Sequence, residues 1–183
     1  MNKVVKRWFY AVRKAVDDLD NKSTMDAVIN KISEASEYYK TAMEDAEKDL
    51  LKVGRLEDLV LKTTSMAFFY KGVSIDIQQT RSYLEMVIES YKSRKYIWYT
   101  LDEEGKQVHG KLTATEANNL VKGEEAVEII NDCVRVLANH QNHFENIVSC
   151  FERRGYELKT ISDLRNSGNH EVWIDETKET IND

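Results

Sequence analysis

The sequence predicts a mainly α-helical bundle with long, heptad-patterned helices and one small β-hairpin near residues 95–110. The 183 residues include no proline and only seven glycines, the two residue types that most disfavour helix interiors. Hydrophobic residues make up 42% of the chain and charged residues 32%, which suits amphipathic helices around a packed interior. We expect residues 1–166 to form a single helical domain, followed by a polar, acidic tail over residues 167–183.

Apolar residues at three- and four-residue steps predict the helices of the first half of the chain. A helix is expected over about residues 2–19, either as part of the domain or as an appended N-terminal element over residues 1–20. Ser23, with Asp26 three residues later, predicts the N-terminus of a long second helix. This helix is expected to be interrupted at Gly54 and to end at Gly72, and another helix is expected over residues 74–94.

The middle of the chain changes pattern. Residues 95–101, Lys-Tyr-Ile-Trp-Tyr-Thr-Leu, are rich in β-branched and aromatic types, and an Asp-Glu-Glu-Gly turn follows them. This pattern predicts the β-hairpin, which we expect to close at Gly110. Thr113 and Glu116 then form a capping box, which predicts a short helix that ends at Gly123.

The strongest periodic signal is a heptad seam over more than three heptads near the C-terminus, which predicts a long helix closed by Gly155 and a short capping segment to Asn166. Such a seam predicts self-association, although one chain does not tell whether it closes within the subunit or between subunits. Gln141 on the seam either sets register or oligomer state, or is merely tolerated. The predicted oligomerisation residues are Val127, Ile130, Val134, Leu137, Gln141, Phe144, Val148 and Phe151.

The composition and residue patterns of the chain indicate the cellular compartment of the protein. No apolar run approaches the 18 residues of a membrane span, and the first residues lack a secretory signal pattern. Cys133 and Cys150 lie too far apart on one predicted helix to bridge each other, which indicates a reducing compartment. We expect a cytoplasmic protein, in the host cell cytoplasm if a phage encodes it, with no membrane partner.

Residue patterns of catalytic chemistry are absent. His140 and His143 share one helix side near Glu145, but no further His or Cys completes a zinc site, so we expect no metal. The two cysteines lack a neighbouring base, and the chain has no glycine-rich phosphate loop or nucleophile-elbow motif. The sequence therefore predicts a protein with no cofactor and no catalytic residues.

One cluster suggests nucleic-acid binding. Residues 91–99 interleave three cations with four aromatic residues, a mixture in which cations engage phosphates and rings stack on unpaired bases. The structural alternative is that the rings pack the hairpin onto the helices while the cations extend into solvent. A net charge of −6 excludes a surface that coats nucleic acid everywhere, so any site must be local.

Three segments carry a family resemblance. The first is Tyr39-Lys40, followed after a long polar helix by Phe69-Tyr70-Lys71-Gly72, and the second is Leu112-Thr113-Ala114. The third is the run Arg154 to Arg165, with an Arg-Gly-aromatic start and Lys, Ile, Asp and Arg after it. In this order, over roughly residues 35–166, the chain resembles the UvsY family of recombination mediators from T-even-like phages. Residues 1–30 have no counterpart in the resemblance.

The resemblance implies a non-enzymatic, oligomeric protein that binds single-stranded DNA. It would help to load a RecA-like strand-exchange protein onto DNA covered by single-strand binding protein. The family's basic residues before the aromatic pair fall here on Thr64 and Met66, so other cations must substitute for them. The predicted nucleic-acid-binding residues are Lys62, Lys71, Lys92, Arg94, Lys95, Tyr96 and Trp98. The alternative function is a helical protein-interaction factor without DNA contact, such as a phage inhibitor or assembly adaptor.

Overall fold

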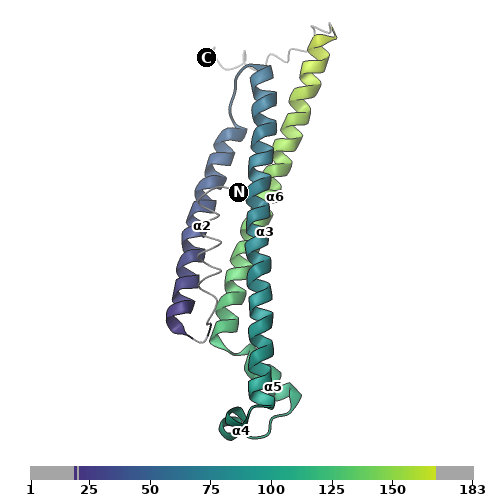
Figure 1. Ribbon diagram of the computed structural model, residues 1–183. Coiled ribbons are helices and arrows are strands. Elements are labelled where there is room, and N and C mark those ends of the chain that lie inside the picture. The colour runs from purple at the N-terminus through teal and green to yellow at the C-terminus, as the bar shows by residue number, and fades with distance from the viewer. Residues whose placement is uncertain (1–18, 20, 168–183) are drawn as a thin grey trace, which may run out of the picture.

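A computed structural model describes Leu19 and residues 21–167, and these residues form a bundle of long helices (Figure 1). The mainly α-helical prediction is therefore confirmed. The helix predicted over residues 2–19 and the tail after Ser167 lie outside the described residues, apart from Leu19 itself. The helices in chain order are α2 (Lys22–Leu50), α3 (Leu56–Thr100), α4 (Glu103–His109), α5 (Ala114–Lys122) and α6 (Glu125–Asn166).

Helix α6 is the common partner of the two other long helices. It packs along most of α3 and along α2, whereas the backbones of α2 and α3 come close to each other at few positions. Figure 1 shows that α3 and α6 extend beyond α2 at the end where α3 begins, and that α4 and α5 cover the opposite end. Among the described residues, no third helix covers this end of the α3–α6 pair.

Aromatic rings fill the core between the three long helices. The ring of Tyr70 stacks between those of Phe144 and Phe151, at centroid distances of 6.0 and 5.4 Å. Tyr39 of α2 meets Phe144 edge-on, also at 6.0 Å. All four side chains are almost fully buried, and each such ring removes about 150–250 Å² from water, so this cluster dominates the attachment of α2 and α3 to α6.

The predicted heptad seam of α6 is the α6 side of this core. Seven of its residues are buried and Val134 is half-buried, packed against the core of the same chain. The seam therefore closes within the subunit in this structure. Self-association through it would require α2 or α3 to move away. Its polar member Gln141 accepts a hydrogen bond from Arg81 Nη1 of α3 at 3.0 Å and donates one to Glu145 at 2.8 Å.

The predicted β-hairpin near residues 95–110 is wrong. Residues 95–100 are the last turns of α3, and residues 103–109 form the short helix α4. Aromatic residues favour a strand here by local preference, but in the structure they pack between helices. Tyr99 of α3 is buried against Ala117 and Val121 of α5. Asp102 then caps α4 by accepting a hydrogen bond from the backbone N–H of Glu104.

Three helix ends predicted from the sequence also differ in the structure. Gly72 and Gly155 lie inside α3 and α6, because the cost of about 1 kcal/mol for a glycine in a helix is small against the packing on both sides. The N-cap of α2 is Asn21 rather than Ser23, whose backbone N–H donates to the Asn21 side chain. The interruption near Gly54 is confirmed, since α2 ends at Leu50 and α3 begins at Leu56.

The α4–α5 cap depends on two glycines and one capping box. A Cβ atom on Gly105 would lie 2.1 Å from the carbonyl oxygen of Trp98, so only glycine allows α4 to approach the end of α3. Gly110 ends α4 with a φ of 73°, a left-handed conformation that favours glycine. The predicted Thr113–Glu116 capping box is present, and α5 ends before Gly123 as expected.

Candidate nucleic-acid interface

All seven residues predicted to bind nucleic acid lie on α3, but the structure does not bring them together. Lys62 and Lys71 belong to the first five turns of the helix, and the other five to its last three turns. At 1.5 Å per residue, Lys71 and Lys92 are about 30 Å apart along the helix axis. The predicted site therefore consists of two separate parts, one at each end of the bundle.

The part nearer the α4–α5 cap is built into the fold. Lys95 lies 3.8 Å from Glu124, with its ammonium 5.4 Å from the ring centre of Tyr91 and 5.7 Å from that of Trp98. The hydroxyl of Tyr99 donates to the same glutamate at 2.6 Å, and that of Tyr91 does so at 3.3 Å. Glu124 precedes the first residue of α6, so these contacts fix the start of α6 against α3. The structural alternative thus accounts for most of this cluster.

The remaining residues of this cluster are more accessible. Lys92 pairs with Glu89 on its own helix at 2.7 Å, an exposed pair of the kind that contributes little to stability. Arg94 is exposed and has no carboxylate within ion-pair distance among residues 21–167. With Tyr91, Lys95 and Trp98 it lines a shallow pocket. Tyr96 is half-buried and packs against the Tyr99 cluster.

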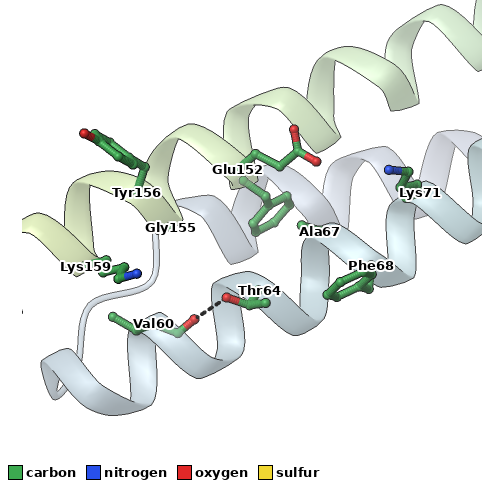
Figure 2. A pocket seen from close by; sticks show the side chains of 10 residues that line it. Val60, Thr64, Ala67, Phe68, Lys71, Glu152, Gly155, Tyr156 and Lys159 are labelled. Carbon is green, nitrogen blue, oxygen red and sulfur yellow. Dashed lines mark hydrogen bonds between the residues drawn. The ribbon is translucent and has the colours of Figure 1, made fainter.

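A groove lies at the other end of the bundle, where α2 no longer covers α3 and α6. Figure 2 shows its α3 residues in succession along one wall and its α6 residues along the other. Its volume is about 320 Å³, and Ala67 and Phe151 form an apolar floor. The other lining residues are Val60, Thr64, Phe68, Lys71, Glu152, Gly155, Tyr156 and Lys159.

Rings and cations are both accessible at this groove. The side chains of Phe68 and Tyr156 are 72% and 75% exposed, which is unusual for rings of this size. Lys71 and Lys159 are exposed and lie on opposite walls, and neither has a carboxylate within ion-pair distance in the described part of the chain. Among the described lining residues Glu152 is the one acid against two lysines, so these residues together carry a net positive charge.

The groove is the place where two segments of the family resemblance meet. Phe69-Tyr70-Lys71-Gly72 lies on α3 and Arg154-Gly155-Tyr156 on α6, about 85 residues later in the chain. The guanidinium of Arg154 donates to the carbonyl oxygens of Asp49 and Lys52, and so holds the C-terminal end of α2 beside the groove. Gly155 faces Thr63, where a Cβ atom would make an ordinary contact at 3.7 Å.

Of the residues that line the groove, the sequence pattern singles out Lys71 as a candidate for nucleic-acid binding but not Phe68, Tyr156 or Lys159. Tyr156 and Lys159 belong to the run Arg154 to Arg165 that carries the family resemblance, so the sequence did contain a signal for them. They were missed because Gly155 was interpreted as a helix end, whereas α6 continues to Asn166 and carries both side chains along the groove. Lys62, also predicted, lies 3.8 Å from Asp49 near the α2–α3 loop and does not line the groove.

Among the described residues, the histidines and cysteines form no second site. His140 is buried and forms a 2.7 Å hydrogen bond with the Ser36 hydroxyl of α2, and burial, with smaller effects of His143 and Lys40, lowers its pKa. Burial raises the pKa of the Cys133 thiol to about 11, which leaves it protonated and unreactive. Across Leu19 and residues 21–167, no three His, Cys, Asp or Glu side chains gather as metal ligands would.

Comparisons with known proteins add no identity to this geometry. No family model, no curated protein and no solved structure matches the chain. None of the described helices combines the length and the apolar character needed to cross a membrane.

Proposed function

We propose that the protein is a single-stranded-DNA-binding recombination mediator, and that the α3–α6 groove is its DNA site. In this function the protein self-associates and helps to load a RecA-like strand-exchange protein onto DNA covered by single-strand binding protein. The observation that carries the proposal is the convergence of two resemblance segments, one around Lys71 and one around Tyr156, on a single groove. The packing of α3 along α6 brings these two segments together, and Lys71 and Tyr156 both remain exposed where they meet.

The chemistry of the groove suits an unpaired strand. The exposed ring of Tyr156 provides a stacking face, and stacking contributes about 1–3 kcal/mol per base without selecting sequence. Lys71 and Lys159 provide cations for the phosphates of the same strand. Two cations make a weak site, and the net charge of −6 opposes it, so assembly of several copies is needed to multiply the contacts.

The DNA site is tested by the fluorescence anisotropy of labelled oligo-dT titrated with the full-length chain at low salt. The groove variant Lys71→Gln/Lys159→Gln and the ring variant Tyr156→Ala should each weaken binding about tenfold or more, as expected for the loss of phosphate contacts or of one stacked base. The matched control is Lys92→Gln/Arg94→Gln, which removes the same charge at the other end of α3 and should change the affinity little.

Two outcomes would contradict this assignment. If the Lys92/Arg94 control weakened binding as much as the groove variant or more, the DNA site would lie at the cap end of α3, among the residues predicted from the sequence. If the wild-type chain failed to bind oligo-dT at micromolar concentration, the proposal of DNA binding would be refuted altogether.

Loading is tested separately from binding. A purified RecA-like strand-exchange protein hydrolyses ATP only once it assembles on a strand, so its ATPase activity on oligo-dT covered by single-strand binding protein reports loading. The wild-type chain should shorten the lag of this activity, and the groove variant should not. An unchanged lag with a chain that binds DNA would limit the function to strand binding.

A second candidate function is a protein-interaction factor that does not contact DNA. The observation that favours it is the set of large apolar side chains that α3 exposes to solvent, among them Leu61, Ile75 and Met86. This candidate predicts no oligo-dT binding together with retained association, so the anisotropy titration separates it from the mediator.

A further inference from the structure

Helix α3 carries a second periodic stripe on the side that faces away from the core. Its positions follow one another at steps of four and three residues, with one additional step of four, and therefore share one helix face. Buried residues such as Tyr70, Ile77 and Leu84 occupy the opposite face. We name this the outer stripe, and it consists of Leu61, Ser65, Phe68, Gly72, Ile75, Gln79, Ser82, Met86, Ser90, Ser93 and Ile97.

The outer stripe is exposed, rich in apolar side chains and free of charge. Every one of its eleven residues is exposed, and the exposed fractions of Leu61, Phe68 and Met86 reach 72%, 72% and 60%. None of the eleven is charged, although charged residues make up 32% of the chain. A solvated helix face normally carries such charges, so this pattern is typical of a helix that packs against another on both sides.

Two of the five polar members of the outer stripe, Ser65 and Ser93, already use their hydroxyl donors within α3. The hydroxyls of Ser65 and Ser93 donate to the carbonyl oxygens of Leu61 and Glu89 on the same helix, at 3.0 and 2.9 Å. A partner that covered these serines would therefore bury no unsatisfied hydroxyl donor. At Gly72 an added Cβ would meet nothing within 4 Å, so no packing inside the described chain explains a glycine in mid-helix. A close approach by another backbone does explain it.

We infer that the outer stripe is the surface through which two copies of this chain associate, α3 against α3. From Leu61 to Ile97 the stripe is about 54 Å long at 1.5 Å per residue, and a helix is about 10 Å wide. Two copies would bury about 1,000 Å² in total, the area at which specific interfaces begin. Heptad spacing on one helix matches the same spacing on a second copy. A stripe without charge places no like charges in contact, which matters for a chain with a net charge of −6.

This inference names the surface for the self-association that is part of the proposed function, and it rests on the proposed function to that extent. The interface itself does not require DNA binding. It assigns association to α3 rather than to the α6 seam, which the core already occupies. Phe68 is shared between the outer stripe and the rim of the groove, so the test uses Ile75 and Met86, which do not line the groove. Both surfaces can then be altered independently.

The test is the mass of the full-length chain in solution without DNA, measured by light scattering and sedimentation velocity. The wild-type chain should be a dimer or a larger oligomer. The variant Ile75→Glu/Met86→Glu should dissociate, with a dissociation constant raised about 100-fold or more, because glutamates would be buried without partners. The matched control Asn131→Glu/Asn146→Glu adds the same charge at exposed positions of α6 and should associate like the wild type.

Each outcome decides the matter. A monomeric wild-type chain, or a stripe variant as associated as its control, would overturn the inference. Far-UV circular dichroism checks that the variants remain helical, and if the glutamates prevent folding, Ile75→Ser/Met86→Ser should still weaken association. The failure of this interface is distinguishable from the failure of the proposed function, because oligo-dT binding is measured by anisotropy and mass is measured without DNA.

Discussion

The partly buried hydrogen bond between Arg81 and Gln141 offers a quantitative test of how α6 is held in register against α3. The guanidinium donates to Gln141 at 3.0 Å, the amide of Gln141 donates to Glu145 at 2.8 Å, and Arg81 Nε lies 3.2 Å from Glu85. Gln141 is 8% exposed, so leucine would fit the apolar seam around it. The test is a double-mutant cycle. Gln141→Leu removes the acceptor, Arg81→Met removes the donor, and the double variant removes both.

The expected coupling free energy follows from the geometry. A hydrogen bond with one charged partner contributes about 1.5–3 kcal/mol, and the Arg81 side chain is 29% exposed, so water replaces part of the lost contact. We expect a coupling of about 1.5 kcal/mol, measured from urea unfolding of the four proteins by circular dichroism. The cycle cancels the gain from burying a leucine, which a single variant would not.

A coupling of about zero, within the usual additivity error of 0.3–0.5 kcal/mol, would refute the reasoning. Gln141 would then be a polar residue that the seam merely tolerates, the alternative that the sequence left open. A coupling near the expected value would assign to Gln141 the role of fixing register within the subunit.

Three further predictions concern stability. Gly105→Ala places a Cβ 2.1 Å from the Trp98 carbonyl oxygen, so α4 must shift, and we expect a loss of about 1–3 kcal/mol in urea unfolding with faster hydrogen exchange over residues 103–109. Gly155→Ala has room for its methyl group and should raise the unfolding free energy by up to about 1 kcal/mol, which a lower thermal midpoint would contradict. Burial lowers the pKa of His140 in the folded chain below its ordinary value of about 6.5, so at pH values below 6.5 the unfolded chain binds more protons than the folded chain. The free energy of unfolding should therefore be constant above pH 6.5 and fall as the pH decreases through the folded pKa. His140→Gln should flatten this pH dependence in unfolding measured from pH 8 to 5.

The long helices and the core were predictable because their signal is periodic. The apolar stripe of α6 continues for more than three heptads, and a pattern of that length leaves little choice of structure. The helix ends expected at Gly72 and Gly155 are wrong, because glycine has only a small local preference for ending a helix. Gly72 and Gly155 remain helical since packing on both sides exceeds the cost of about 1 kcal/mol that each imposes.

The hairpin was wrongly predicted because aromatic side chains serve a strand and a buried helix end equally well. Tyr99 is buried by α5, a contact between residues that the local pattern cannot foresee. The site was predicted in part for a related reason. Proximity in sequence gathered Lys92, Arg94 and Lys95, whereas the groove takes Lys71 from one helix and Lys159 from another.

The most direct test of the central claim is the salt dependence of oligo-dT binding for the wild-type chain and the Lys71→Gln/Lys159→Gln variant. Each phosphate contact to a single strand contributes a slope of about −0.7 to the plot of log affinity against log salt concentration. If both lysines contact phosphates, the variant should lose about 1.4 units of slope per subunit engaged, while Lys92→Gln/Arg94→Gln retains the wild-type slope. Equal slopes for the wild-type chain and the groove variant would contradict a DNA site between α3 and α6.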